Sequence, residues 1–159
     1  MANSQSVAAE QRLRELGIEL PTPPRPFGAY VESVQSGRLL FLSGMLPVVD
    51  HKPKYIGRLG QELDVDSGRD ALRTASMSAL AAVRAHLGTL DRVTRVVRLG
   101  IYLATSGDFF DRPKVADAAS ELFESIFGKE KTSVRMVLGV ASLPLGMPVE
   151  LEVILEVAE

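Results

Sequence analysis

Residues 134–156 read VRMVLGVASLPLGMPVELEVILE, which is two runs of alternating apolar residues separated by Leu143-Pro144-Leu145-Gly146. Alternation at period two around a Pro/Gly break predicts two half-buried strands joined by a loop. In the second run one face carries only apolar residues, namely Val149, Leu151, Val153, Leu155 and Val157. The glutamates between them, Glu150, Glu152 and Glu156, then point away from the core.

The first run divides in the same way. One face carries Val134, Met136, Leu138 and Val140, and the other carries Arg135, Val137 and Gly139. We therefore predict that Arg135 and Glu150 share the side of the sheet that faces away from the core. From the pattern alone a salt-bridged surface is the simpler interpretation of this pair, because exposed ion pairs are common and weak.

Two long amphipathic helices precede this stretch. The first is expected to begin at Asp66-Ser67 and to end at Gly88, and the second to be capped by Asp108 or Asp111 and to end before Gly128. Their buried stripes are Leu72, Ala75, Ala79, Val83 and Leu87 in the first, and Val115, Ala119, Leu122 and Ile126 in the second. Between them the alternating set Val97, Leu99, Ile101 and Leu103 predicts a strand with an apolar face.

The N-terminal part contains a short helix, a connector and a hairpin. Ser4 or Ser6 is expected to cap the helix, and four prolines in residues 21–26 force an extended connector. Residues 29–35 and 37–43 predict two hairpin strands that turn near Gly37. We therefore divide the chain into a helix and connector at 1–26 and a single domain at 27–159.

The order of elements predicts the fold class. Two long helices with single apolar stripes cover one face of one sheet, which gives an α/β two-layer sandwich. The chain has 159 residues, a net charge of −2 and no cysteine, which excludes disulfides and thiolate chemistry and gives no basic footprint for nucleic acid. No segment is apolar enough to span a membrane, and we expect a cytoplasmic location.

Two blocks of sequence resemble the signatures of one family. Arg135, the VASLP at 140–144 and the VELE at 149–152 are similar to the C-terminal signature of the YjgF/RidA family, also called endoribonuclease L-PSP-like proteins. Gly28-Ala29-Tyr30 and Ser43-Gly44-Met45-Leu46-Pro47 resemble its G-P-Y and S-G-x-x-P segments. The resemblance implies a chorismate mutase-like fold, in which two helices pack on one mixed sheet.

The resemblance also implies a chemistry, the hydrolysis of small enamines or imines such as 2-aminoacrylate to a 2-keto acid and ammonia. Arg135 would hold the substrate carboxylate with its planar fork, and Glu150 would position and deprotonate the attacking water. Tyr30 would form a wall of the pocket, and Ser43 and the Gly44 backbone would face the ligand. No metal and no organic cofactor is implied.

The chain departs from the family pattern at three places. Met136 and Val137 stand where active deaminases carry Ser or Thr and often Cys, so the pocket is less polar. Asp117 aligns near the family's Asn and brings a carboxylate to the ligand site that could pair with Arg135 and compete with an anionic substrate. Ala29 replaces the usual Pro. These features indicate a divergent subgroup whose ligand could be another small carboxylate or carbonyl compound.

Two other function classes stay open. One is a non-catalytic metabolite-binding trimer that keeps Arg135 as an anion anchor, and the other is an endoribonuclease or translation inhibitor. The acidic balance and the lack of an arginine-rich stripe argue against nucleic acid as a partner.

The sequence also predicts an oligomer. Two helices leave the second sheet face uncovered, and that face is expected to present Val96, Tyr102, Val137 and Ile154 to the outside. A second copy of the chain is the expected cover. The resemblance implies a homotrimer whose sites lie between subunits.

Overall fold

The computed structural model describes residues 7–159, and all elements given below lie in this range. The helices are α1 (Ala9–Glu15), α2 (Val65–Leu87) and α3 (Arg112–Phe127), with 3-10 turns η1 (Leu90–Arg92), η2 (Lys129–Lys131) and η3 (Pro144–Gly146). The strands are β1 (Ser33–Ser36), β2 (Leu39–Leu42), β3 (Val48–Val49), β4 (Lys52–Pro53), β5 (Val93–Ala104), β6 (Val134–Val140) and β7 (Val149–Val157). Ser4 and Ser6, the predicted caps of the first helix, lie outside the described residues.

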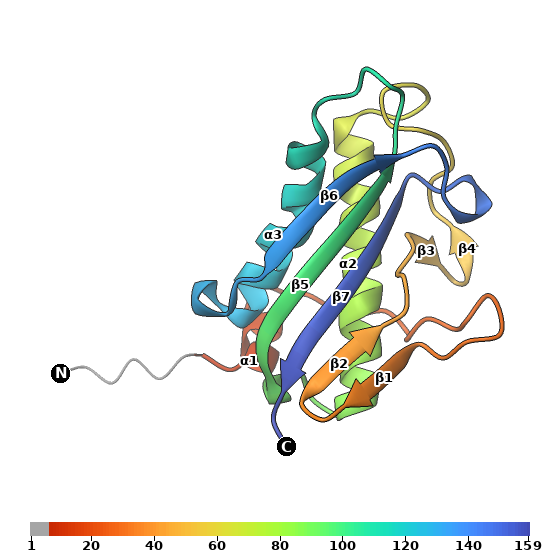
Figure 1. Cartoon of the computed structure of the whole chain (residues 1–159). Coiled ribbons are helices and arrows are strands. Elements are labelled where there is room, and N and C mark those ends of the chain that lie inside the picture. The colour runs from red at the N-terminus through yellow and green to blue at the C-terminus, as the bar shows by residue number, and fades with distance from the viewer. Residues whose placement is uncertain (1–6) are drawn as a thin grey trace.

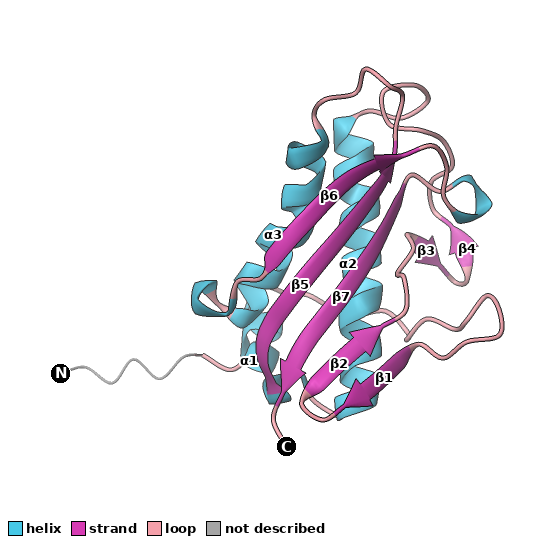
Figure 2. Cartoon of the chain, viewed as in Figure 1, coloured by secondary structure: helices cyan, strands magenta, loops and turns pink. Residues whose placement is uncertain are grey.

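The fold has two layers. In Figure 1 the sheet faces the viewer, and α2 and α3 lie behind it. The sheet has the strand order β1-β2-β7-β5-β6, while β3 and β4 form a separate hairpin at its side (Figure 2). β5 and β6 are parallel and are connected through α3, and the other neighbours are antiparallel. The predicted sandwich of two long helices on one mixed sheet is confirmed.

The two long helices form where the apolar period and the capping residues predict them. Asp64 caps α2 by accepting a hydrogen bond from the Ser67 backbone at 2.8 Å, and Gly88 ends the helix with φ 83°. The helix thus begins slightly before the predicted Asp66-Ser67. α3 follows Asp111 and carries Pro113 in its first turn, as predicted. All nine residues of the two predicted stripes are buried: Leu72, Ala75, Ala79, Val83, Leu87, Val115, Ala119, Leu122 and Ile126.

The N-terminal helix packs on the same core. Leu13 is buried among the apolar residues that also cover the sheet. The Glu10 carboxylate binds the Arg84 guanidinium at 2.6 Å and accepts a hydrogen bond from the Leu90 backbone at 2.9 Å. These contacts fix α1 to the C-terminal end of α2.

The hairpin is shorter than predicted. β1 and β2 span four residues each and turn at Gly37, which has φ 60°. Residues 29–31 leave the ladder, because the Tyr30 backbone N–H turns back to the Gly28 carbonyl at 3.0 Å. This loop brings the Tyr30 ring toward the end of the sheet where β7 begins.

The prediction for the faces of β6 is wrong. Arg135 pairs in register with Leu99, which itself pairs with Val153 of the buried face, so Arg135 and Val137 lie on the helix side of the sheet. The opposite side chains are turned outward, with Val134 69%, Met136 40% and Leu138 43% exposed. The outward side of this edge strand is the more apolar of the two, so alternation shows which residues share a face, but apolar character does not show which face the helices cover. Arg135 and Glu150 therefore lie on opposite faces of the sheet.

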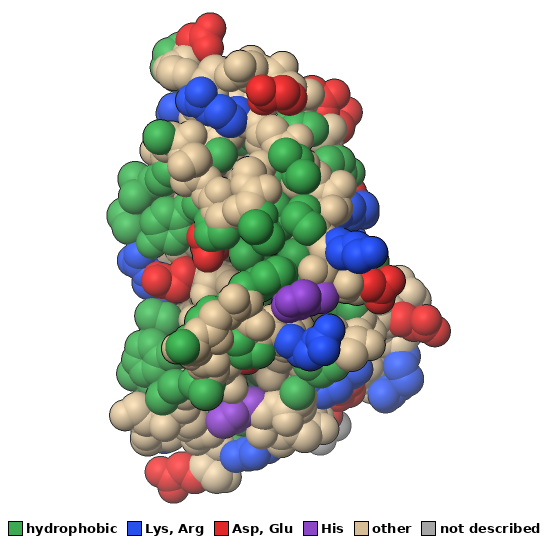
Figure 3. Space-filling model, turned by 90° about the vertical axis from the view of Figure 1, so that its right-hand side faces the viewer, with side chains coloured by type: hydrophobic (Ala, Val, Ile, Leu, Met, Phe, Trp, Pro, Cys, Tyr) green, Lys and Arg blue, Asp and Glu red, His purple; other side chains and the backbone are tan. Residues whose placement is uncertain are grey.

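The composition of the open face changes accordingly. Of the four residues predicted there, Tyr102 and Ile154 are on it, but Val137 packs against the core and Val96 is 2% exposed. A register shift in β5 between Val96 and Arg98 turns Val96 inward. The open face nevertheless carries exposed apolar side chains, Val134, Met136 and Leu138 on β6 and Phe41 on β2, on either side of the Arg98–Glu152 ion pair. Hydrophobic side chains gather along the left edge of Figure 3, where this face is seen edge-on.

Within residues 7–159, no helix combines the length and the apolar character that a bilayer crossing requires.

Candidate functional site

A pocket of about 520 Å³ lies where β7 begins. Four segments far apart in the sequence meet there: the loop before β1, the residues after β2, the turn η3 and the first residues of β7. Its lining residues are Phe27, Gly28, Tyr30, Ser43, Gly44, Leu46, Pro144, Leu145 and Glu150. Four residues predicted from the sequence, Tyr30, Ser43, Gly44 and Glu150, are thus brought together.

Glu150 is the acidic group of this pocket. It stands on the open side of β7, between the buried residues Val149 and Leu151. Desolvation by the surrounding apolar groups raises the pKa of the Glu150 carboxyl above its ordinary value. Among residues 7–159 none donates a hydrogen bond to this carboxylate within the chain, so its oxygens are free for a ligand or a water molecule.

Gly44 lies directly against Glu150. The backbone of Met45 exchanges two hydrogen bonds with Leu151, at 2.7 and 2.9 Å, and this bridge holds the two segments together. A Cβ atom at position 44 would collide with Glu150 Oε1. Glycine at this position therefore lets the carboxylate lie against the backbone, and a larger side chain would displace it.

The two hydroxyl groups of the pocket are held by neighbouring backbone groups. The Tyr30 hydroxyl accepts a hydrogen bond from the Phe27 N–H at 2.9 Å, and the Ser43 hydroxyl donates to the Val31 carbonyl at 2.6 Å. These bonds close the loop before β1 over the end of β2. The phenol proton of Tyr30 and the lone pairs of Ser43 remain able to contact a ligand.

The apolar walls were not identified from the sequence. Phe27 and Leu145 line the pocket, and Phe27 also stacks on the His51 ring with the ring centroids 4.0 Å apart. Leu145 has φ 56° and is 60% exposed, so its side chain stands out from η3. The available signals were an aromatic residue directly after the proline-rich connector and an apolar residue between Pro144 and Gly146.

The pocket contains no cation among the residues that the structure describes. Its ionisable side chains are the Glu150 carboxyl and the Tyr30 phenol, with no Arg, Lys or His in the lining. This half of the predicted site offers a base and an apolar surface, but no partner for a carboxylate ligand.

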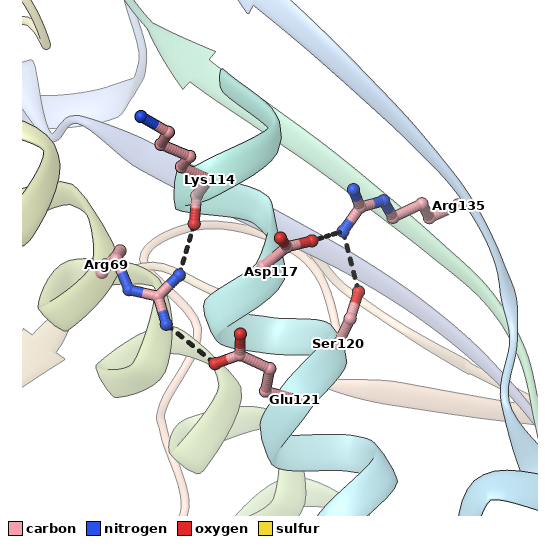
Figure 4. Close-up of polar contacts among 6 residues, drawn as sticks. All are labelled: Arg69, Lys114, Asp117, Ser120, Glu121 and Arg135. Atoms are coloured by element: carbon pink, nitrogen blue, oxygen red, sulfur yellow. Dashed lines mark hydrogen bonds and ion pairs between the residues drawn. The ribbon is translucent and has the colours of Figure 1, made fainter. Parts of the chain in front are cut away.

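Arg135 and Asp117 form a second cluster on the helix side of β6. The Arg135 Nη1 atom lies 2.7 Å from Asp117 Oδ1 and 3.0 Å from Ser120 Oγ, both on α3 (Figure 4). The predicted pairing of Asp117 with Arg135 is thus formed. The six predicted site residues fall into two groups, and the chain does not bring the arginine to Glu150.

Comparisons with known proteins agree on one family. The family described as "YjgF/chorismate_mutase-like, putative endoribonuclease" matches residues 10–156. Protein TCP17 of Trypanosoma cruzi is 40% identical over 145 residues, which cover 91% of each chain. A 2-iminobutanoate/2-iminopropanoate deaminase of Dermatophagoides farinae is 30% identical over 137 residues, covering 85% of this chain and 91% of the relative. A solved "putative endoribonuclease" of Shewanella oneidensis superposes with a TM-score of 0.90 at 30% identity, covering 95% of this chain and 100% of that one.

Proposed function

Because the chain belongs to the YjgF/chorismate mutase-like family, which matches residues 10–156, we propose that it hydrolyses small reactive enamines or imines to carbonyl compounds and ammonia. The observation that carries the proposal is the Glu150 carboxylate, which is partly desolvated, free of hydrogen bonds from within residues 7–159 and placed in the wall of a largely apolar pocket. The named deaminase that is 30% identical over 137 residues supports this reaction class.

The reaction requires proton transfer and a confined water molecule. An enamine first tautomerises to an imine, its carbon gaining a proton while its nitrogen loses one, and water then adds to the C=N carbon. Glu150 accepts a proton from this water and passes it to the nitrogen, which gives the carbinolamine. The hydroxyl proton then moves to the amine as the C–N bond breaks, which releases ammonia and leaves the carbonyl product. A positioned general base contributes roughly 10²–10⁴-fold to such a step, most when its pKa lies near the working pH. The raised pKa of Glu150 moves it in that direction.

The missing cation is supplied in our proposal by a second copy of the chain. Arg135 lies on the opposite sheet face from Glu150 of the same chain, so it cannot reach the pocket that Glu150 lines. The β6 side of the open face, with Val134, Met136 and Leu138 40–69% exposed, is a surface that a neighbouring copy would cover. We propose a homotrimer with sites between subunits, and the number three rests on the family resemblance.

Ammonia release from freshly generated 2-aminoacrylate tests the reaction. Wild-type protein should accelerate it, and Glu150→Gln should abolish the acceleration while keeping the shape of the pocket. Glu156→Gln is the matched control on the same strand, since Glu156 pairs with Arg38 at 3.5 Å and does not line the pocket. Equal turnover by Glu150→Gln and wild type would contradict the role of Glu150.

The same purified protein also tests two alternative functions. A wild type that binds a 2-keto acid in titration without releasing ammonia would be a small-carboxylate binder. Cleavage of RNA by the wild type, without turnover of 2-aminoacrylate, would favour a nuclease. The net charge of −2 argues against the nuclease, because RNA binding relies on neutralising phosphates.

A further inference from the structure

The guanidinium of Arg135 is held by one of its three nitrogens. Nη1 donates to Asp117 Oδ1 at 2.7 Å and to Ser120 Oγ at 3.0 Å. Asp117 and Ser120 are three residues apart on α3, so both side chains project from the same face of the helix toward β6 (Figure 4). The contact therefore fixes the direction of the arginine as well as neutralising much of its charge.

The other edge of the Arg135 guanidinium, formed by Nε and Nη2, remains available to a ligand. Within residues 7–159 neither Nε nor Nη2 of Arg135 has a hydrogen-bond partner, and the side chain is 30% exposed. An oxygen of a ligand can therefore accept from this edge while Asp117 stays in place. Such a ligand meets an ion pair with a net charge near zero instead of an isolated cation.

We propose that Asp117 sets the charge preference of the site, so that Arg135 recognises an uncharged carbonyl or imine compound in preference to a carboxylate. This inference rests on the proposed function, because it assumes that Arg135 contacts the ligand. The Asp117 carboxylate repels a second carboxylate at the free edge, about 5 Å away across a partly solvated guanidinium, and at that separation the repulsion lowers affinity roughly five- to tenfold. A neutral oxygen acceptor keeps its hydrogen bonds and loses little.

A neighbouring ion pair on the same helix provides a matched control. Glu121 binds the Arg69 guanidinium at 2.7 Å and thereby joins α3 to α2 (Figure 4). Glu121→Gln removes a carboxylate next to an arginine, as Asp117→Asn does, but does not touch Arg135. If Asp117 only tied β6 to α3, the two substitutions would act on ligand binding in the same way.

The test compares a charged probe with a neutral one of similar shape, pyruvate and methyl pyruvate, by calorimetric titration of the intact assembled protein. Asp117→Asn should strengthen pyruvate binding roughly five- to tenfold, and change methyl pyruvate binding less than twofold. Glu121→Gln should leave both unchanged. Ser120→Ala, which removes a bond to Arg135 but no charge, should weaken both probes in parallel, so that their affinity ratio stays that of the wild type.

An unchanged affinity ratio in Asp117→Asn would overturn the proposal, as would the same shift in Glu121→Gln or no binding of either probe to any form. Thermal melting beside each titration shows whether Asp117→Asn folds. If it does not fold, the same two titrations are made with Asp117→Ser. The titrations do not depend on turnover. A wild type that binds both probes and releases no ammonia therefore overturns the proposed reaction but not the charge preference.

Discussion

Glu150 and Gly44 illustrate how one pair of residues determines the shape of the pocket. The carboxylate reaches the backbone at position 44 only because no side chain stands there. Tyr30, Ser43, Gly44 and Glu150 could be assigned to this pocket because their two sequence blocks resemble the family signatures. The apolar walls Phe27 and Leu145 could not, since they come from loops whose course no periodic pattern predicts.

We predict that Gly44→Ala lowers ligand binding with little loss of stability. The new methyl group displaces the carboxyl end of the Glu150 side chain, which is flexible and can turn away, so the free energy of unfolding should change by less than about 1 kcal/mol while the carboxylate leaves its position in the pocket. Urea denaturation and probe titration measure the two effects. Gly107→Ala is the control, because a Cβ there meets nothing within 4 Å, and it should stay within about 0.5 kcal/mol of wild type. A Gly44→Ala protein that binds the probe as tightly as this control would contradict the close contact.

The pH dependence of stability should report the burial of Glu150. Desolvation raises the pKa of its carboxyl in the folded protein above the unfolded value, so the folded state binds the proton more tightly. The resulting stabilisation is fully present below the unfolded pKa and is lost as the pH rises through the folded pKa. Glu150→Gln lacks this loss, so its stability relative to wild type should increase with pH over that window. Urea denaturation of both proteins across the window measures it, and a constant difference would contradict the desolvation.

The edge strand β6 is the element for which the sequence was least informative. The helices α2 and α3 could be predicted closely because their stripes have a polar opposite face and their ends have Asp and Gly caps. β6 has apolar side chains on both faces, so the covered side depends on where α3 passes, which the strand itself does not encode. The inward turn of Val96 likewise depends on an inserted residue in β5 that alternation hides.

Two adjacent substitutions distinguish the faces of β6. Val137→Asp places a charge against the core side, where Val137 packs, and should cost about 2–4 kcal/mol of the free energy of unfolding. Leu138→Asp places the same charge on the open face, where Leu138 is 43% exposed, and should leave folding intact while weakening self-association. Denaturation and sedimentation of both variants decide the matter. The reverse outcome would restore the assignment predicted from alternation alone.

For the whole molecule, the open sheet face predicts assembly. An apolar surface that includes Val134, Met136, Leu138 and Phe41 is costly to leave in water. Light scattering at micromolar concentration should give a mass of three times the 17.2 kDa chain, and dilution to monomers should abolish ligand binding. A stable monomer that still binds pyruvate would contradict both the trimer and the shared site.

The placement of Arg135 and Glu150 on opposite faces has a genetic consequence. Chains carrying Arg135→Lys and chains carrying Glu150→Gln are each expected to be inactive alone, yet together they should complement one another. In a closed ring, each site takes Glu150 from one chain and Arg135 from the next. Every mixed trimer then contains an intact site, so that about a third of the sites in a mixed trimer are intact. Unfolding and refolding the two proteins together should therefore restore activity. Glu150→Gln refolded with Gly44→Ala should not exceed the activity of Gly44→Ala alone, because both changes fall on the same half of the site. Two alleles that each fail would then support growth when expressed in the same cell, and such rescue is denied to any enzyme whose site is complete within one chain.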